Sequence, residues 1–196
     1  IRLTYRQLFL RSFILGRIIA PFSKPGERVG ILLPTSAGGL VTFSSLQAYG
    51  RIPALLNFTG GSRSLISACE TGQIRTVLTS RIFVKKGGFS EKVAELSKVV
   101  NIIYLEDLRP RIGVWQKISG LLASFWPERR LKKLGVKPDD ESVVLFTSGS
   151  EGEPKGVVLS HNNLLCNIHQ IRARIALHSD DICLNVLPMF HAFGLT

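Results

Sequence analysis

The sequence is poor in cysteine, and its cysteines are not arranged for cross-linking or for metal binding. Cys69, Cys166 and Cys183 are odd in number, lie far apart and form no Cys-x-x-Cys pair. Disulfide frameworks and zinc sites require paired cysteines or cysteines at short, fixed spacings. We therefore expect neither a disulfide-stabilised secreted domain nor a zinc site, and we place the chain in a reducing cytosol.

Acidic residues are also scarce. The chain has 14 Asp and Glu against 25 Lys and Arg, which gives a formal net charge of +11. This balance favours acidic partners, such as a nucleotide, an acidic protein, an anionic lipid or a nucleic acid. One class of function is therefore a basic module that binds nucleic acid or a membrane without chemistry. Because no segment resembles a zinc finger, an RNA-binding aromatic motif or a recognition helix, we expect no nucleic-acid partner.

An uninterrupted hydrophobic run of membrane-spanning length is missing as well. The longest uncharged stretch, residues 29–50, has enough residues to cross a bilayer, but a proline, several glycines and polar residues interrupt it. It instead predicts a buried strand at 29–33, a turn at 34–36 and then a helix rich in small residues. A spanning helix is not expected here.

Neither end of the chain has the features of a natural terminus. The first residue is Ile1 rather than a methionine, and the chain stops at Thr196 without a cap or a polar tail. We expect a fragment cut from a longer chain, and no secretory or transit signal can be identified in it. With 45% hydrophobic and 20% charged residues, it falls in the ordinary globular range and can bury a sizeable core.

Short apolar runs of strand length recur between segments of helical character. Ser62, Ser90 and Ser160 stand where they can cap three of these helices. This alternation predicts an α/β fold, with Rossmann-like, mostly parallel sheets and flanking helices. The expected strands are 29–33, 52–56, 76–79, 102–105, 143–146 and 182–186.

A change of composition near residues 135–141 predicts a seam between two lobes. A basic stretch gives way there to a turn rich in proline and acidic residues. We divide the chain into a first lobe, residues 1–138, and the beginning of a second lobe, residues 139–196. The second part carries the motifs that point to chemistry.

The most informative segment is the loop 147–156, which follows the apolar strand 143–146. Its glycines let backbone N–H groups converge on an anion, its hydroxyl groups add donors, and Lys155 supplies a positive charge. It is not a Walker A loop, because Pro154 stands where that pattern has its second glycine and Lys155 is followed by Gly156. The competing interpretation is a glycine-rich surface hairpin.

The loop resembles the signature loop of the adenylate-forming superfamily, [ST]-[ST]-G-[ST]-[TE]-G-x-P-K-G, at every position. Residues 187–194 resemble the next motif of that superfamily, at the expected spacing. The resemblance implies the N-terminal part of the large domain of such an enzyme, with Lys155 and His191 catalytic. It further implies that His191, Phe193 and Gly194 contact the substrate. The nucleotide would be held by Thr147, Ser148, Gly149, Ser150, Glu151, Gly152, Pro154, Lys155 and Gly156.

The family chemistry implied by this resemblance is attack of a carboxylate on the α-phosphate of ATP. It yields an acyl-adenylate and pyrophosphate, after which a thiol captures the acyl group. Lys155, the loop amides and the loop hydroxyls would hold the β- and γ-phosphates together with Mg²⁺. No metal site made by protein side chains is expected. For Glu151, either an indirect role at Mg²⁺ or a position in solvent remains open.

Two short segments and one residue of the loop point further, to a subgroup. Residues 57–61 and 104–108, together with Glu151, look like the acyl-acyl carrier protein synthetase domain of bacterial 2-acylglycerophosphoethanolamine acyltransferase. That likeness implies a fatty acid substrate, acyl carrier protein as acceptor and a lysophospholipid that reacts in a separate acyltransferase domain. It also implies the bacterial cytoplasm, at the cytoplasmic face of the inner membrane. The alternative within the class is a fatty acyl-CoA ligase.

An aromatic and basic segment admits two interpretations. Trp115, Ile118, Leu122 and Phe125 fall on one side of a helix, and a basic run at 129–133 follows. Such a segment can lie on an anionic membrane surface, or it can be a core-facing helix followed by a solvated turn. We favour packing against the core, because amphipathic helices in globular domains usually serve that purpose.

Overall fold

The computed structural model describes residues 3–148, 154–176, 178, 180–182 and 184–195. They form a six-stranded sheet with the strand order β4-β3-β1-β2-β5-β6. Neighbouring strands from β4 to β5 run parallel, and β6 pairs antiparallel with β5 at the edge. The strands are β1 (Arg28–Leu32), β2 (Ile52–Leu55), β3 (Thr76–Thr79), β4 (Asn101–Tyr104), β5 (Glu141–Ser148) and β6 (Pro154–Ser160).

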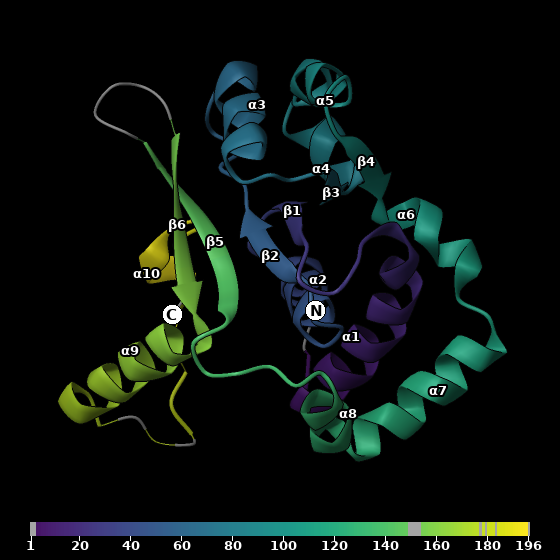
Figure 1. Ribbon diagram of the computed structural model, residues 1–196, viewed down its shortest axis with the longest axis vertical. Helices are drawn as coiled ribbons and strands as arrows, with labels where there is room; N and C mark the ends of the chain where they lie inside the picture. The colour runs from purple at the N-terminus through teal and green to yellow at the C-terminus, as the bar shows by residue number, and fades with distance from the viewer. Residues whose placement is uncertain (1–2, 149–153, 177, 179, 183, 196) are drawn as a thin grey trace.

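Helices connect the parallel strands, as Figure 1 shows. The α/β class with a mostly parallel sheet, predicted from the alternation of apolar runs, is therefore confirmed. The helices are α1 (Tyr5–Ile19), α2 (Ala37–Gln47), α3 (Ser62–Thr71), α4 (Arg81–Lys86), α5 (Ser90–Leu96), α6 (Leu105–Leu108), α7 (Val114–Phe125), α8 (Pro127–Lys133), α9 (His161–Arg174) and α10 (Ala192–Leu195), with short 3₁₀ turns at 20–22 and 109–111.

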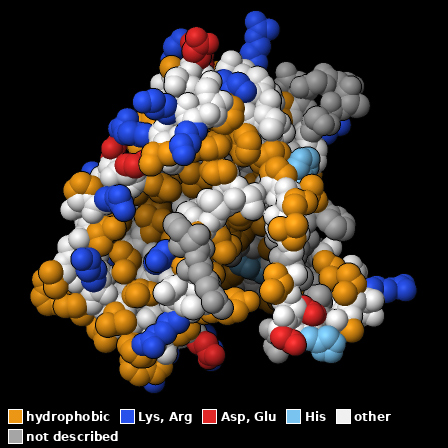
Figure 2. Space-filling view, turned by 180° about the vertical axis from the view of Figure 1, so that it is seen from behind, with side chains coloured by type: hydrophobic (Ala, Val, Ile, Leu, Met, Phe, Trp, Pro, Cys, Tyr) orange, Lys and Arg blue, Asp and Glu red, His pale blue; other side chains and the backbone are white. Residues whose placement is uncertain are grey.

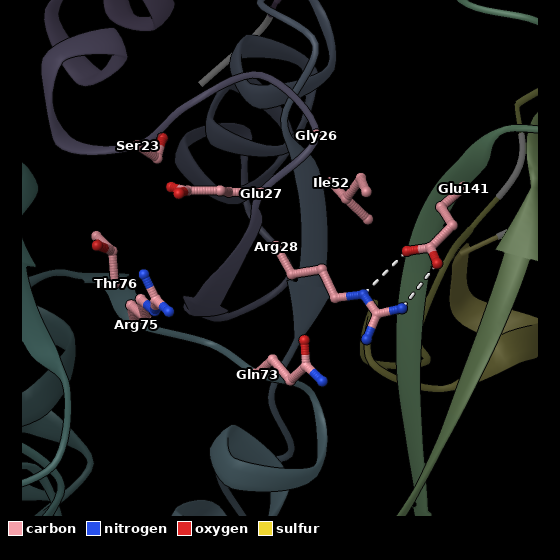
Figure 3. A pocket seen from close by; sticks show the side chains of 9 residues that line it. All are labelled: Ser23, Gly26, Glu27, Arg28, Ile52, Gln73, Arg75, Thr76 and Glu141. Atoms are coloured by element: carbon pink, nitrogen blue, oxygen red, sulfur yellow. Dashed lines mark hydrogen bonds and ion pairs between the residues drawn. The ribbon is translucent and has the colours of Figure 1, made fainter.

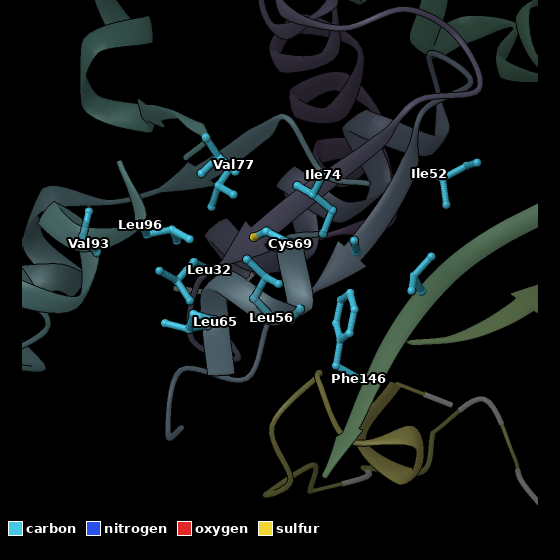
Figure 4. Packing of buried hydrophobic residues seen from close by; sticks show 14 of the residues in the cluster. Leu32, Ile52, Leu56, Leu65, Cys69, Ile74, Val77, Val93, Leu96 and Phe146 are labelled. Atoms are coloured by element: carbon cyan, nitrogen blue, oxygen red, sulfur yellow. The ribbon is translucent and has the colours of Figure 1, made fainter. Parts of the chain in front are cut away.

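Two hydrophobic clusters cover the two faces of the sheet. In β5, Val144 and Phe146 belong to the cluster beneath α3, α4 and α5, part of which is shown in Figure 4. Val143 and Leu145 belong to the other cluster, with residues of α1 and α2. Because successive side chains of a strand point to opposite faces, a strand buried on both sides reads as a continuous apolar run. This explains why the sequence revealed β5 so clearly.

The chain between residues 29 and 50 forms the predicted strand, turn and helix. Ser36 caps α2, and its side chain accepts a hydrogen bond from the backbone N–H of Gly39 at 3.2 Å. Among the residues that the structure describes, no helix is both long enough and apolar enough to cross a bilayer.

Only one of the three predicted serine caps is correct. Ser160 caps α9 in a reciprocal arrangement with Asn163. Ser62 and Ser90 are instead the first residues of α3 and α5, and neither helix has a side-chain cap. Gly61 takes the extended cap conformation before α3, so the helix begins one residue earlier than expected, and the Ser62 hydroxyl is not in the capping position.

The predicted strand at 182–186 is wrong for the residues described there. Ile182, Leu184 and Val186 are 97%, 87% and 75% exposed and form no ladder, and Cys183 lies outside the described residues. A strand needs a neighbouring strand to pair its backbone, and no strand in the described part of the chain pairs with this segment. An apolar run alone does not supply that partner.

The predicted orientation of the aromatic helix is also wrong. Trp115 and Leu122 of α7 are 77% and 56% exposed, so the apolar stripe does not pack into the core. Gly120, on the other side of the helix, is its buried residue. The helix therefore contacts the protein through small residues rather than through its large apolar ones.

The sheet continues across the proposed boundary at residue 138. Arg28 of β1 donates hydrogen bonds of 2.9 and 2.8 Å to the Glu141 carboxylate of β5, at a cavity of about 360 Å³ by the amino ends of the strands (Figure 3). Strand β5 also pairs with β2. The division into lobes 1–138 and 139–196 remains a prediction, with the sheet shared between them.

Candidate functional site

Strands β1 to β5 all end at the same edge of the sheet. The chain proceeds from β1 to β2 on one side and then returns to place β3 on the other side of β1. In open α/β sheets, ligands bind outside the carboxyl ends of the strands, at the point where the winding reverses. This edge is therefore the first place to look for a functional site, and it is opposite the edge that carries the Arg28–Glu141 pair.

A cavity of about 1000 Å³ opens at this reversal point. Its walls are largely apolar, and Lys86 and Arg109 add positive charge. Glu106 also lines it, but its carboxylate accepts hydrogen bonds from the Ser80 hydroxyl at 2.7 Å and from the Arg81 N–H at 3.1 Å. The lining residues are Leu33, Pro34, Ser36, Ala37, Gly38, Gly39, Ser80, Ile82, Phe83, Lys86, Leu105, Glu106 and Arg109.

The Glu106 carboxylate is a structural anion. Burial raises its pKa, but the hydrogen bonds from Ser80, Arg81 and Ile82 outweigh this effect and hold the pKa below its ordinary value. Glu106 is therefore ionised at neutral pH, and it anchors the start of α4 instead of acting as a base.

The hairpin β5–β6 presents the predicted phosphate-binding loop at the same edge. Thr147 lies directly opposite Lys155, and Ser148 lies opposite Pro154, at the end of the ladder. Thr147 and Lys155 are both exposed, and no ion pair among the described residues involves Lys155. The pairing thus brings a hydroxyl-bearing residue and a cation together. The predicted contacts Gly149, Ser150, Glu151 and Gly152 lie outside the described residues.

A polar loop after β2 borders this hairpin. Asn57, Thr59 and Gly60 share a cavity of about 160 Å³ with Thr147 and Pro154. The Asn57 side chain accepts hydrogen bonds from the backbone N–H and the hydroxyl of Thr59, at 2.9 and 2.7 Å. Lys92 donates to the carbonyl oxygen of Gly60 at 2.7 Å. Hydrogen bonds within the loop, and one from Lys92 of α5, therefore fix the conformation of the loop next to the phosphate-binding hairpin.

The second motif is joined to this edge through an aromatic contact. Phe190 is buried and belongs to the cluster that contains Val143 and Leu145 of β5. Its ring lies 5.0 Å from the ring of Phe58, edge to face. His191 is exposed, with its ring 5.0 Å from that of Phe190. Burial of Phe190 thus fixes the backbone position from which His191 projects.

Thr35, which sequence reasoning missed, holds the start of the second motif. Its hydroxyl donates to the carbonyl oxygen of Leu187 at 3.4 Å and accepts from the N–H of Met189 at 3.0 Å. Thr35 follows β1 at its carboxyl end, where polar residues commonly contribute to sites. The position of Thr35, soon after the predicted strand 29–33, is the feature of the sequence that could have indicated this role.

Gly194 closes the turn of the second motif. It is buried, and its carbonyl oxygen accepts a hydrogen bond from the Asn185 side chain at 2.9 Å. Its N–H donates to the His191 carbonyl oxygen at 2.9 Å. Phe193 lies within α10. The predicted residues of this motif are therefore in one compact turn beside β5.

The described residues supply neither an activated buried thiol nor a metal-binding cluster. Burial raises the pKa of the Cys69 thiol to about 12, so this thiol is neutral at physiological pH and is a poor nucleophile. Among the described residues, no three His, Cys, Asp or Glu side chains come together to hold a metal ion.

Comparisons with known proteins show the family and the fold of the chain. A family model described as AMP-binding enzyme matches residues 1–196. The chain belongs to the AMP-binding enzyme family. This membership confirms the adenylate-forming superfamily that the two motifs indicated.

The chain has curated relatives among plant enzymes. It is 27% identical over 202 residues to 4-coumarate–CoA ligase from Vanilla planifolia, covering 98% of this chain and 35% of the relative. It is 29% identical over 174 residues to 4-coumarate–CoA ligase from Pinus taeda, covering 87% of this chain and 31% of the relative. The chain therefore spans about a third of the length of these relatives.

Solved structures share its fold. One is o-succinylbenzoate CoA synthetase from Bacillus subtilis in complex with an acyl-adenylate intermediate, with a TM-score of 0.76 and 20% identity, covering 98% of this chain and 45% of the other. Another is the N-terminal domain of FACL13 from Mycobacterium tuberculosis, with a TM-score of 0.77 and 19% identity, covering 100% and 46%. The fold is thus that of the N-terminal part of adenylate-forming enzymes.

We expect Thr35→Val to weaken the attachment of the second motif. The substitution keeps the shape of the side chain but removes both hydrogen bonds, and each hydrogen bond contributes on the order of 1 kcal/mol. In the full-length protein, acid-dependent ATP–pyrophosphate exchange should fall about tenfold. Thr71→Val, at the exposed end of α3, is the matched control. Equal exchange rates in the two variants would contradict the role given to Thr35.

Proposed function

We propose that this chain is the N-terminal part of a ligase that uses ATP to convert a carboxylic acid into an acyl-adenylate. The observation that carries the proposal is the meeting of two motifs at one edge of the sheet. The turn at 187–194 contacts Thr35 after β1 and Phe58 after β2, and the hairpin with Thr147 opposite Lys155 shares a cavity with the loop after β2. The family membership and the acyl-adenylate bound to a protein of the same fold support it.

The chemistry proposed for this site requires charge neutralisation more than a protein nucleophile. Lys155 is an exposed cation that forms no ion pair with the described residues, and it would face the phosphates of ATP. Thr147, with the loop amides that follow it, would add hydrogen-bond donors. Mg²⁺, when bound with the nucleotide, would supply further positive charge at the β- and γ-phosphates. His191 would border the acyl and adenylate positions.

The proposed acid is a fatty acid. The cavity of about 1000 Å³ beside Thr35 has apolar walls that suit an alkyl chain, and Lys86 and Arg109 at its lining suit a negatively charged group. The acceptor proposed for the acyl group is the thiol of acyl carrier protein, an acidic partner that matches the net charge of +11. The product would then serve reacylation of a lysophospholipid in a separate acyltransferase domain.

The second candidate is a fatty acyl-CoA ligase, which the names of the curated relatives favour because they are CoA ligases. The two candidates differ only in the thiol that takes the acyl group. We place either enzyme in the bacterial cytoplasm, at the cytoplasmic face of the inner membrane.

Acyl transfer by the full-length protein tests the acceptor. The protein is incubated with ATP, Mg²⁺ and a series of fatty acids, and with either holo acyl carrier protein or CoA. Faster acylation of the carrier protein is the result we expect. Preference for CoA would replace the first candidate with the second. Absence of acyl transfer to either thiol, with any acid, would contradict the proposed function.

A further inference from the structure

Helix α7 turns its small and polar side toward the protein and its large apolar side toward solvent. A Cβ atom on the buried Gly120 would overlap the side chain of Ile14 in α1, so the two helices approach closely there. On the opposite side, Trp115, Ile118 and Leu122 are exposed. Surface helices of globular proteins normally place their apolar stripe on the core. Because of this reversed orientation, the apolar stripe is exposed and can contact an apolar partner outside the described fold.

The exposed stripe continues beyond α7 and forms one patch, which we call the aromatic face. Large exposed apolar patches on a protein surface mark interaction sites. In Figure 2, hydrophobic and basic side chains lie together at the lower left, where α7 and α8 of Figure 1 come to lie after the half turn. The aromatic face comprises Trp115, Ile118, Leu121, Leu122, Phe125 and Trp126, each more than 40% exposed.

Positive charge surrounds the aromatic face. The segment 109–137 contains eight Lys and Arg residues and a single acidic residue, Glu128. The guanidinium of Arg6 lies 5.2 Å from the centre of the Phe125 ring, and that of Arg129 lies 5.7 Å from the Trp126 ring. Cations are therefore placed at the level of the aromatic rings, where lipid phosphates would meet them.

We propose that α7 and α8 form a docking surface for an anionic lipid bilayer, with the aromatic face among the headgroups and upper acyl chains. With 12 residues, α7 is about 18 Å long and too short to span a membrane, so it lies along the surface. Tryptophan near both ends of an apolar stripe flanked by lysine and arginine suits the interface of a bilayer. An acidic protein would complement the charges but not six large apolar side chains, so the bilayer is the better match. The inference does not depend on the proposed function.

The two tryptophans of the chain report directly on this surface. Both Trp115 and Trp126 lie in the aromatic face, and these 196 residues contain no other tryptophan. Mixing the full-length protein with vesicles rich in phosphatidylglycerol should shift the tryptophan emission to the blue and carry the protein with the vesicles in flotation. Trp115→Phe/Trp126→Phe should remove the shift. Phosphatidylcholine vesicles should do neither, and added salt should weaken the binding.

Double substitutions test whether the aromatic face and its charges, and not other surfaces, bind the vesicles. Ile118→Glu/Leu122→Glu should weaken vesicle binding about tenfold or more, because the apolar side chains are lost from the face. Lys132→Glu/Lys133→Glu should weaken it by a similar factor, about tenfold. Two controls match them in chemistry: Leu165→Glu/Ile168→Glu on the exposed side of α9, and Lys85→Glu/Lys98→Glu, in α4 and just beyond α5. Both controls should bind like the unaltered protein.

Several outcomes would overturn the docking surface. Equal binding to neutral and anionic vesicles, or a loss in the α9 control as large as in the α7 variant, would contradict it. So would a lipid-free dimer in size-exclusion chromatography that Ile118→Glu/Leu122→Glu converts to a monomer, because a second copy would then cover the face. Circular dichroism of each variant before mixing confirms that it is folded.

Discussion

Lys155→Ala should reduce acid-dependent ATP–pyrophosphate exchange by the full-length protein about 10²- to 10³-fold, the usual effect of removing a group that stabilises developing charge. Lys155 is exposed at the start of β6, directly opposite Thr147, and is not needed for a buried contact. The loss should therefore occur without a change in the melting temperature. Exchange is followed by incorporation of labelled pyrophosphate into ATP at saturating acid.

Lys98→Ala is the matched control for this experiment. Lys98 is also an exposed lysine, and it pairs with Glu95 at the surface at 2.7 Å, far in sequence from the hairpin. Surface pairs of this kind contribute little to stability, about 0 to 1 kcal/mol. A Lys155→Ala protein with the same exchange rate as Lys98→Ala would show that Lys155 does not contact the phosphates.

Gly194→Ala should damage both the fold and the activity of the second motif. A Cβ atom on Gly194 would overlap the carbonyl oxygens of Pro188 and Leu187, which belong to the same turn. Both are backbone atoms, so the turn itself must shift, at a cost of about 1–3 kcal/mol in unfolding free energy. Displacing His191 from its position should lower the exchange rate about a hundredfold. Chemical denaturation and the exchange assay measure the two effects.

Gly61→Ala provides the comparison for that substitution. Gly61 precedes α3 with φ −72°, and a Cβ atom there would meet nothing within 4 Å. The same chemical change should therefore leave stability and exchange almost unaltered. If Gly194→Ala matched Gly61→Ala in both measurements, the packing of the turn would not be a requirement of the site.

The sequence predicted the central sheet well because its strands are buried on both faces. Continuous apolar runs such as 76–79 and 143–146 then mark the strands directly, and the observed bounds agree within a few residues. The same signal failed at 182–186, where the run is apolar but no neighbouring strand pairs with it. The sequence pattern shows that a segment is apolar. Whether that segment pairs as a strand depends on whether the fold places another strand beside it.

The candidate site could be predicted only where a motif was continuous in sequence. The hairpin at 147–156 and the turn at 187–194 were found by their patterns, although the roles of their residues remain predictions. Thr35 and Phe58 were not found, because each is a single residue whose contact with the second motif is established only by the folded sheet. The orientation of α7 was missed for a similar reason. Its amphipathic pattern fixes which residues share a side, but not which side meets the protein.

The products formed from doubly labelled ATP test the central claim most directly. The full-length protein is given a fatty acid, Mg²⁺ and ATP labelled at the α- and γ-phosphates, without an acceptor thiol. Adenylation predicts that the α-label joins the acyl group as an acyl-adenylate, while the γ-label leaves in pyrophosphate. Transfer of the γ-label to the acid with release of ADP, or no acid-dependent consumption of ATP, would contradict the proposal that this edge of the sheet supports adenylation.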